Sequence, residues 1–432
     1  MKQLKYTLLL LFLILITSCG EDRTHEYVEL TEHNTWMYGV MKDKYLWGDL
    51  IAEQNYKAYF YDGTKFFSTL VSSVNKADSW SYCLLDSVAT DPHMRGFFNH
   101  LDTYGLDITM ITDPTKMTSR SFARVTYVAP GSVAEQCGLH RNDFISVVDN
   151  TRLTTSNASK YLESGSSHTV VFHHIDTISG DTLGWVDTTT VTLPASAYVE
   201  EQAFPVRNFL NYRGSWIGYL MCNRLMAYPD EIQTEGDKYL KQLDEHMQYF
   251  LEEQPTEFVL DLRFCNYGTL EVARRLASYI VPLNRRNVPF AKTQWNDRYA
   301  ANNQTFDYDT TLGSLELSRV FIIVSNYTQG AAEWLIRSLK NTLGEDNVIL
   351  IGNPTKGQNV LTQHVGSAFG HQLYPAVAYV SDGGDNYLYN SLTPNYTLSE
   401  SNSNLLLYMK EFGDPYEVLF LATLYAMFDD EE

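Results

Sequence analysis

The chain of 432 residues, 44% of them hydrophobic, is long enough to bury a sizeable core and to form two or three domains. Its formal net charge of −20 argues against nucleic acid as a partner and against attachment to an anionic membrane through a basic face. The histidines and cysteines do not follow metal-ligand spacing. We therefore expect no nucleic acid, no metal and no cofactor.

The first residues predict a targeting segment that is not part of the fold. Residues 1–18 combine early lysines with an apolar run that is too short for a stable membrane span. The run ends in Ile-Thr-Ser before Cys19 and resembles a lipobox, which implies cleavage before Cys19 and lipid attachment to its thiol. We expect a lipoprotein signal peptide over 1–18 and a lipidated acidic tether over 19–26. An ordinary signal peptide with a chance cysteine is the alternative.

The lipobox resemblance also implies a location. Such a chain is anchored by its lipid to the outer membrane of a Gram-negative bacterium, on the periplasmic or the cell-surface side, and contacts the membrane only through the anchor. Glu21 and Asp22 follow Cys19 and resemble the surface-export signal of some lipoproteins.

Four cysteines remain besides Cys19, and they could be thiols or disulfides. An oxidising periplasm permits a disulfide, but each cysteine lies among apolar residues, which favours buried free thiols. These residues are Cys83, Cys137, Cys222 and Cys265.

Residues 27–100 predict an N-terminal helical domain that is rich in aromatic side chains. One helix is expected over 33–47 and a second over 63–74, and Asp78-Ser79-Trp80-Ser81 follows. We interpret the aromatic residues as core packing.

Residues 101–196 predict a β-rich domain. The run from Val128 to Val148 contains Pro-Gly-Ser, then Cys-Gly-Leu, then Asn142-Asp143-Phe-Ile. This pattern resembles a PDZ domain, with Asn142 in place of the usual glycine in a turn that needs positive φ. The resemblance implies a loop whose backbone N–H groups bind a peptide's terminal carboxylate while the peptide adds a strand to the sheet. The residues at that loop are Tyr104, Gly105, Leu106 and Ile108.

Residues 197–432 predict an open α/β core. Unbroken apolar runs at 320–324 and 348–351 predict buried strands, and leucines four residues apart predict a helix from Ala331. Further elements are expected as strands over 215–220 and 258–263 and as helices over 229–251, 270–280 and 413–428.

Three segments of this core resemble peptidase family S41, the tail-specific or C-terminal processing serine peptidases. They are Thr328-Gln-Gly-Ala-Ala-Glu333, Gly352-Asn-Pro-Thr-Lys-Gly-Gln358 and Asp261-Leu-Arg-Phe-Cys-Asn-Tyr-Gly268. The resemblance implies a multidomain α/β chain: an N-terminal helical segment, a PDZ-like domain and a core of the crotonase/ClpP-like type. It also implies that protein or peptide C-termini are the ligands.

At the positions that correspond to the family's catalytic residues, this chain has different residues. The nucleophile position is Gly330 and the base position is Gln358, so neither side chain can attack a carbonyl or take a proton near neutral pH. In the loop that helps to form the oxyanion hole, Tyr267 interrupts a Gly-Gly pair and leaves Gly268. We expect Tyr267 to be strained there, because the loop needs positive φ, and also to fill the space that an acyl group would occupy.

Two main hypotheses remain open, and a structural module in a larger complex is a third alternative. The first is a pseudopeptidase that binds peptide or protein C-termini without hydrolysing them. The second is an active serine-type endopeptidase that uses displaced groups, with Thr328 or Ser325 as nucleophile and Lys356 as base.

Other charged residues predict structural roles. Glu333 is expected at a helix N-terminus, where a carboxylate is favoured, and Asp261 with Arg263 is expected to form a structural pair. His168, His173 and His174 are expected on exposed strand positions of the β-rich domain.

Overall fold

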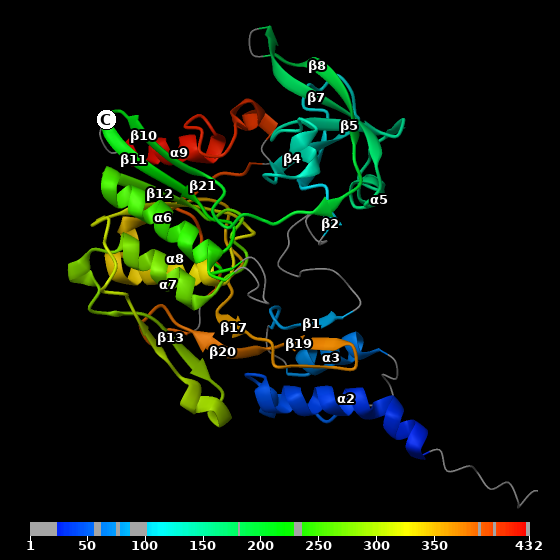
Figure 1. The fold of residues 1–432 in the computed structure, drawn as a ribbon, viewed down its shortest axis with the longest axis vertical. Helices are drawn as coiled ribbons and strands as arrows, with labels where there is room; N and C mark the ends of the chain where they lie inside the picture. Colours follow the sequence, from blue (N-terminus) through cyan, green and yellow to red (C-terminus); the bar gives the residue numbers. More distant parts are fainter. Residues whose placement is uncertain are drawn as a thin grey trace, which may run out of the picture. The chain divides into compact units, whose positions relative to one another are not determined.

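The computed structural model describes residues 24–55, 62–74, 78–86, 102–179, 182–228, 236–387, 390–400 and 403–428. The chain forms two compact units (Figure 1). The first contains the chain up to Val88 together with 296–298 and 362–378, and the second contains the rest. The predictions for the leader and tether fall outside the described residues. No helix in the described ranges is both long and apolar enough to cross a membrane.

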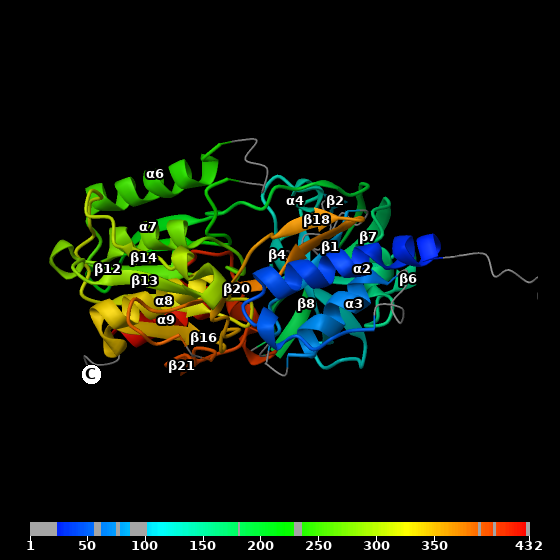
Figure 2. The same ribbon diagram turned by 90° about the horizontal axis from the view of Figure 1, so that it is seen from below.

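The first unit combines two helices with a small sheet. Helix α2 (Thr24–Lys44) and helix α3 (Gly63–Ser72) accompany strands β1 (Tyr82–Leu85), β19 (His371–Tyr374) and β18 (Gly366–Ala368), which are antiparallel (Figure 2). Our expected boundary at residue 197 placed 362–378 in the C-terminal core, but this segment belongs to the first unit because β19 pairs with β1.

Asp78 has a structural role in the Asp-Ser-Trp-Ser segment of the first unit. Its carboxylate accepts hydrogen bonds from the Tyr45 hydroxyl (2.7 Å), the Ser81 hydroxyl (2.6 Å) and the backbone N–H groups of Trp80 and Ser81. The side chain therefore fixes the turn that leads from the helices into β1.

The second unit begins with the β-rich domain. Its sheet has the strand order β3-β4-β5-β7-β8, so β3 lies at one end. The elements are β2 (Asp102–Thr103), β3 (Leu106–Thr112), β4 (Ser121–Val128), α4 (Val133–Gln136), β5 (Phe144–Val148), β6 (Thr151–Arg152), α5 (Ala158–Leu162), β7 (His168–Ser179), β8 (Thr182–Leu193) and β9 (Ala197–Tyr198).

Two expectations about this domain have clear outcomes. Asn142 has a φ of +72°, as predicted for the residue that replaces glycine in the turn. His168 is buried with 9% exposure, so the prediction that it is exposed was wrong. The reason is that its imidazole contacts Asp149 and Ser164 and packs beside Tyr104 and Tyr161.

The α/β core is built on a sheet with the strand order β10-β11-β12-β15-β16-β21. Neighbouring strands from β11 to β21 are parallel, and β10 is antiparallel to β11. The strands are β10 (Arg207–Tyr212), β11 (Ser215–Met221), β12 (Glu257–Asp261), β15 (Val320–Val324), β16 (Val348–Gly352) and β21 (Tyr396–Thr397).

Helices cover both faces of this sheet (Figure 1). Helices α6 (Lys238–Glu253), α7 (Leu270–Ile280) and α8 (Ala331–Leu343) pack on the face formed by alternate residues such as Leu260 and Ile322. Helix α9 (Val418–Phe428) packs on the other face, against Val259 and Phe321. Burial of both faces explains why these strands are continuous apolar runs.

Most predicted core elements are confirmed, with shifted ends. The strands at 320–324 and 348–352 and the helix at 270–280 lie where we expected them. The final helix begins at Val418 instead of residue 413, because Gly413 has a φ of +81° and lies in a turn in which the Asp414 N–H donates to the Glu411 carbonyl (3.2 Å). Helix α6 begins at Lys238, and residues 229–235 lie outside the described ranges.

A further sheet has the strand order β14 (Thr305–Asp307), β13 (Pro289–Trp295), β20 (Ala376–Val380) and β17 (Val360–Thr362). The remaining elements are short 3₁₀ helices: η1 (Gly48–Leu50), η4 (Leu283–Arg285), η5 (Asp297–Asn302), η6 (Glu345–Asn347) and η7 (Ser403–Tyr408).

Candidate functional site

A sharp turn connects β15 to α8 and places Gly330 at the N-cap of the helix. Gly330 has φ +57° and ψ −115°. This backbone conformation is strained for residues with a side chain and costs them about 1–3 kcal/mol, whereas glycine adopts it freely. A turn of this kind exposes the nucleophile in enzymes that use a strand-to-helix elbow. We call residues 325–333 the elbow.

The two positions that we predicted to correspond to the family's nucleophile and base lie side by side. A Cβ atom built on Gly330 would be 3.1 Å from Oε1 of Gln358. Gln358 is 7% exposed, and both ends of its amide form a hydrogen bond: Oε1 accepts from Nε2 of Gln329 (2.9 Å) and Nε2 donates to the carbonyl of Val360 (2.8 Å). A hydrogen bond between the side-chain amides of Gln329 and Gln358 therefore lies where a nucleophile and a base would meet.

Glu333 connects the elbow to the loop that carries Gln358. Its side chain is fully buried and accepts hydrogen bonds from the N–H groups of Gly330 (3.2 Å), Gln358 (2.8 Å) and Gly357 and from the Thr355 hydroxyl. Burial raises the pKa of Glu333, although these hydrogen bonds act in the opposite direction. The predicted role at a helix N-terminus is confirmed, and the carboxylate also fixes a loop that lies 22 to 25 residues further along the chain.

The loop after β12 lies against the same helix terminus. A Cβ atom on Gly268 would be 2.5 Å from Cβ of Leu225 and 3.0 Å from Cβ of Ala331. Neither Gly268 nor Tyr267 has a positive φ, so our expectation that Tyr267 is strained there was wrong. Lack of space, not backbone conformation, requires glycine at 268. The Tyr267 side chain is partly buried and packs against the core, and its carbonyl accepts from the Leu225 N–H at 3.0 Å.

The hydroxyl groups of the displaced-group hypothesis have structural partners. The Thr328 hydroxyl is fully buried, donates to the carbonyl of Leu262 (2.9 Å) and accepts from the Ser325 N–H (2.9 Å). The Ser325 hydroxyl donates to the carbonyl of Arg263 and accepts from the Tyr327 N–H (3.0 Å). Both side chains therefore hold the turn between β15 and α8.

Lys356 does not reach these hydroxyl groups. Its side chain is exposed, and its backbone N–H donates to the carbonyl of Thr328 at 3.1 Å. Within the ranges that the structure covers, its ammonium forms no hydrogen bond with Ser325 or Thr328, whose hydroxyls donate elsewhere.

A buried ionic network lies behind the elbow. Arg263 contacts both oxygens of Asp261 (2.9–3.0 Å from Nε) and both oxygens of Glu417 (2.8 and 3.0 Å), and it also contacts Glu400. Arg141 of the β-rich domain donates to Glu417 (2.9 Å) and Glu400. These carboxylates raise the pKa of Arg263, although burial opposes them. The predicted structural pair of Asp261 and Arg263 is confirmed, and the network joins the β-rich domain to the core.

The predicted peptide-binding residues are close together but are engaged within the chain. Tyr104, Leu106 and Ile108 are 2%, 2% and 8% exposed. The Tyr104 hydroxyl contacts the Ser164 hydroxyl (3.0 Å) and the Ser166 carbonyl. No sequence pattern predicted that Ser164 and Ser166 would be the hydrogen-bond partners of Tyr104.

Two backbone N–H groups of this loop also have partners. The Gly105 N–H donates to the Thr103 hydroxyl (3.2 Å), and the Ile108 N–H donates to Asp107 (2.9 Å). Gly105 has a φ of +79°, and a Cβ atom there would be 2.1 Å from Cβ of Ser132. The glycine therefore lets the loop approach the turn before α4.

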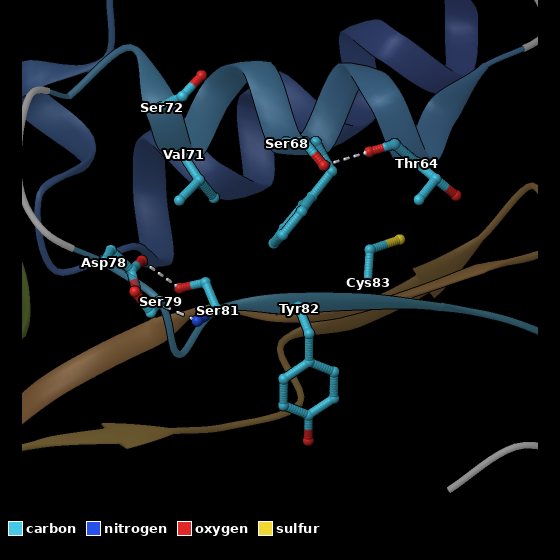
Figure 3. A pocket seen from close by; sticks show the side chains of 10 residues that line it. Thr64, Ser68, Val71, Ser72, Asp78, Ser79, Ser81, Tyr82 and Cys83 are labelled. Carbon is cyan, nitrogen blue, oxygen red and sulfur yellow. Dashed lines mark hydrogen bonds between the residues drawn. The ribbon is translucent and has the colours of Figure 1, made fainter. Parts of the chain in front are cut away.

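A separate cavity of about 920 Å³ lies in the first unit, between α3 and β1 (Figure 3). Ser81 and Cys83 point toward the helix, whereas Tyr82 points away from it (Figure 3). Burial raises the pKa of the Cys83 thiol to about 11, so the thiol is protonated at neutral pH. Among the described residues that line it, Asp78 is the one with a charged side chain, and its oxygens are already bonded as described above. The sequence did not predict this cavity. Its Ser81 hydroxyl donates to the Asp78 carboxylate (2.6 Å) as part of the turn that leads into β1.

With this geometry established, comparisons with known proteins identify the core. The model of peptidase family S41 matches residues 217–397, which contain the elbow and the Glu333 network. The chain contains a peptidase S41 family domain. No curated protein matches its sequence.

Solved structures agree with the S41 assignment. A crystal structure from Bacteroides fragilis NCTC 9343, provisionally named an S41 protease, is 26% identical with a TM-score of 0.80 and covers 92% of this chain and 98% of its own. The photosystem II D1 C-terminal processing protease is 16% identical with a TM-score of 0.50, covers 90% of this chain and 97% of its own, and supports the fold alone.

Proposed function

We propose that this S41 domain has lost peptide hydrolysis and that the protein binds the C-termini of peptides or proteins. One observation carries the proposal: the elbow holds a glycine whose Cβ position faces the amide of Gln358 at 3.1 Å. Acyl transfer by this family needs a nucleophile and a base at these two positions together. A glycine and a glutamine amide supply neither a nucleophile nor a base.

Loss of hydrolysis is consistent with the rest of the elbow. The Glu333 network depends on backbone N–H groups and Thr355, so it persists without a catalytic serine or lysine. The hydroxyls of Ser325 and Thr328 donate to buried carbonyls, which disfavours the displaced-group enzyme. Hydrolysis by these residues would require both hydroxyls to exchange their partners.

The β-rich domain supplies the proposed binding surface, and we assign it the PDZ type on its sequence pattern. Strand β3 is at the end of its sheet, and a peptide could add there as a further strand. Tyr104, Gly105, Leu106 and Ile108 line the start of that strand. Binding of a terminal carboxylate would require the Gly105 N–H to leave Thr103 and the Tyr104 hydroxyl to leave Ser164.

We further propose that the protein works as a lipoprotein. Lipidation of Cys19 would hold it at the outer membrane, on the periplasmic or surface side, where secreted or surface peptides are available. The lipobox-like sequence before Cys19 supports this location.

The proposal is tested by binding measurements on the full-length chain. Fluorescent peptides with apolar C-termini are titrated and followed by anisotropy, beside the same peptides with amidated C-termini. We expect saturable binding that weakens at least tenfold on amidation, because the amide removes the terminal charge, and recovery of intact peptide by mass spectrometry. Equal binding of the two forms would overturn the C-terminal specificity, and peptide fragments would overturn the loss of hydrolysis.

A further inference from the structure

Two buried cysteines meet beside the elbow, although they are 43 residues apart in the sequence. Cys222 directly follows β11, and Cys265 lies in the loop after β12. Their Sγ atoms are 4.0 Å apart, and both residues are fully buried. Both are free thiols in this structure. The remaining described cysteines, Cys83 and Cys137, are only partly buried.

The backbone already holds the two cysteines in adjacent positions. The Cys222 N–H donates to the carbonyl of Asp261 (2.8 Å), which continues the parallel pairing of β11 with β12. The Cys265 N–H donates to the carbonyl of Leu262 (3.0 Å), which turns the loop back toward β11. A disulfide requires about 2.05 Å between sulfur atoms, so each sulfur would need to move by only about 1 Å.

We propose that Cys222 and Cys265 form a disulfide when the chain folds in contact with a thiol-oxidising agent, and that this bond fixes the loop beside the elbow. The oxidant is a disulfide, either small, such as oxidised glutathione, or carried by a dithiol oxidase. One cysteine thiolate attacks it and releases a first thiolate. The second cysteine attacks the resulting mixed disulfide and releases a second thiolate. Two protons leave the cysteines, and two electrons reduce the oxidant.

The cross-link would act on the elbow through one hydrogen bond. The carbonyl of Cys265 accepts from the N–H of Gln329 at 3.0 Å, and Gln329 directly precedes Gly330. The Gln329 side chain in turn donates to Gln358 (2.9 Å). A covalent bond at Cys265 would therefore hold the acceptor that positions the residue before the elbow glycine.

Burial determines when the bond can form. The Cys222 thiol lies away from water, and burial raises its pKa well above the ordinary value, so thiolate is scarce in the folded chain. Because thiolate is the reacting species, oxidation takes place during folding, before the thiols become buried. Once formed, the disulfide would be protected from reductants by the same burial.

Peptide mapping tests the proposal directly. The full-length chain, exported through its own leader into an oxidising periplasm, is denatured and alkylated before and after reduction. We expect Cys222 and Cys265 to be alkylated only after reduction and to be joined in one cross-linked peptide pair, while Cys83 and Cys137 are alkylated at once. Alkylation of Cys222 and Cys265 before reduction, or their linkage to other cysteines, would overturn the proposal.

A second measurement tests the effect on the elbow. We expect the exported chain to melt roughly 5 °C above the same chain after denaturing reduction and refolding, because the cross-link closes a long loop. Hydrogen exchange at the Gln329 N–H should be slower in the oxidised chain. A Cys83→Ala, Cys137→Ala variant should keep both differences, and a Cys222→Ala variant should lose them. Equal exchange at Gln329 in both redox states would contradict the coupling to the elbow.

Discussion

In the elbow around Gly330, the backbone forms a sharp strand-to-helix turn, and the positions that we predict for a nucleophile and a base hold a glycine and a glutamine. In the loop from Tyr104 to Ile108, the groups expected to bind a peptide are present but are bonded within the chain. On the proposed function, hydrolysis at the elbow would need different side chains, whereas peptide binding at the loop would need only an exchange of hydrogen-bond partners. The comparison indicates that the β-rich domain, not the elbow, is where binding should be sought.

The largest expected effect concerns the Glu333 network of the elbow. Replacement Glu333→Ala would leave three N–H groups and the Thr355 hydroxyl without their buried acceptor. We expect the free energy of unfolding to fall by about 3–5 kcal/mol, measured by urea denaturation. Glu345→Ala, on an exposed residue near the other end of α8, is the control and should change it by less than about 0.5 kcal/mol. A small effect at Glu333 would mean that the elbow is not held by this residue.

Acid should weaken the ionic network that joins the β-rich domain to the α/β core. The Arg141 and Arg263 guanidinium groups lower the pKa of Glu400 to about 2, against burial and from an ordinary 4.5. A lowered folded-state pKa stabilises the protein above pH 4.5, and this contribution is lost as the pH falls from 4.5 toward 2. We expect a loss of about 3 kcal/mol from this group, measured by urea denaturation at pH 7, 4 and 2.5. Glu400→Gln should flatten this part of the pH dependence; an unchanged slope would contradict the assignment.

Gly330→Ala tests the strain at the elbow. Alanine would have to adopt φ +57° and ψ −115° and would place Cβ 3.1 Å from Gln358. We expect a loss of about 1–3 kcal/mol in the free energy of unfolding. Gly214→Ala is the matched control, since Gly214 also has positive φ (+89°) but has no atom within 4 Å of the added Cβ. Equal losses would mean that only positive φ matters; no loss at Gly330 would contradict the strained elbow.

The smallest effect is expected in the peptide loop. Tyr104→Phe removes the hydroxyl that contacts Ser164 and Ser166. The variant should lose about 1 kcal/mol of stability, and release of the loop should raise peptide affinity by up to roughly fivefold, measured by anisotropy. Tyr161→Phe, on a neighbouring tyrosine, should leave affinity unchanged. Weaker binding by Tyr104→Phe would mean that the hydroxyl contributes to the peptide site.

The local parts of the fold were predictable from the sequence. The strands at 320–324 and 348–352 are continuous apolar runs because both faces of the sheet are covered, and α8 follows from its spaced leucines. The pairing of positions 330 and 358 was predictable only because the order of the family's segments is kept. Asn142 was predictable because few other residues accept its φ of +72°.

The long-range parts were not predictable. Arg141 and Glu400 meet across 259 residues, and no local pattern marks either residue as a partner. The segment 362–378 joins the first unit through pairing of β19 with β1, which depends on tertiary contacts and not on composition. The sequence showed that Tyr267 interrupts the Gly-Gly pair of the family. It did not show that the backbone φ of Tyr267 is negative, so that the residue is not strained.

The most direct test of the central claim is hydrolysis of an unfolded protein and of tail peptides by the full-length chain. The wild type is measured beside Gly330→Ser with Gln358→Lys, and beside Thr328→Ala, Ser325→Ala and Lys356→Ala. We predict no cleavage by the wild type, because neither position supplies a nucleophile or a base. Cleavage by the wild type that Lys356→Ala or Thr328→Ala abolishes, in variants that remain folded, would contradict the account and establish an active peptidase with displaced groups.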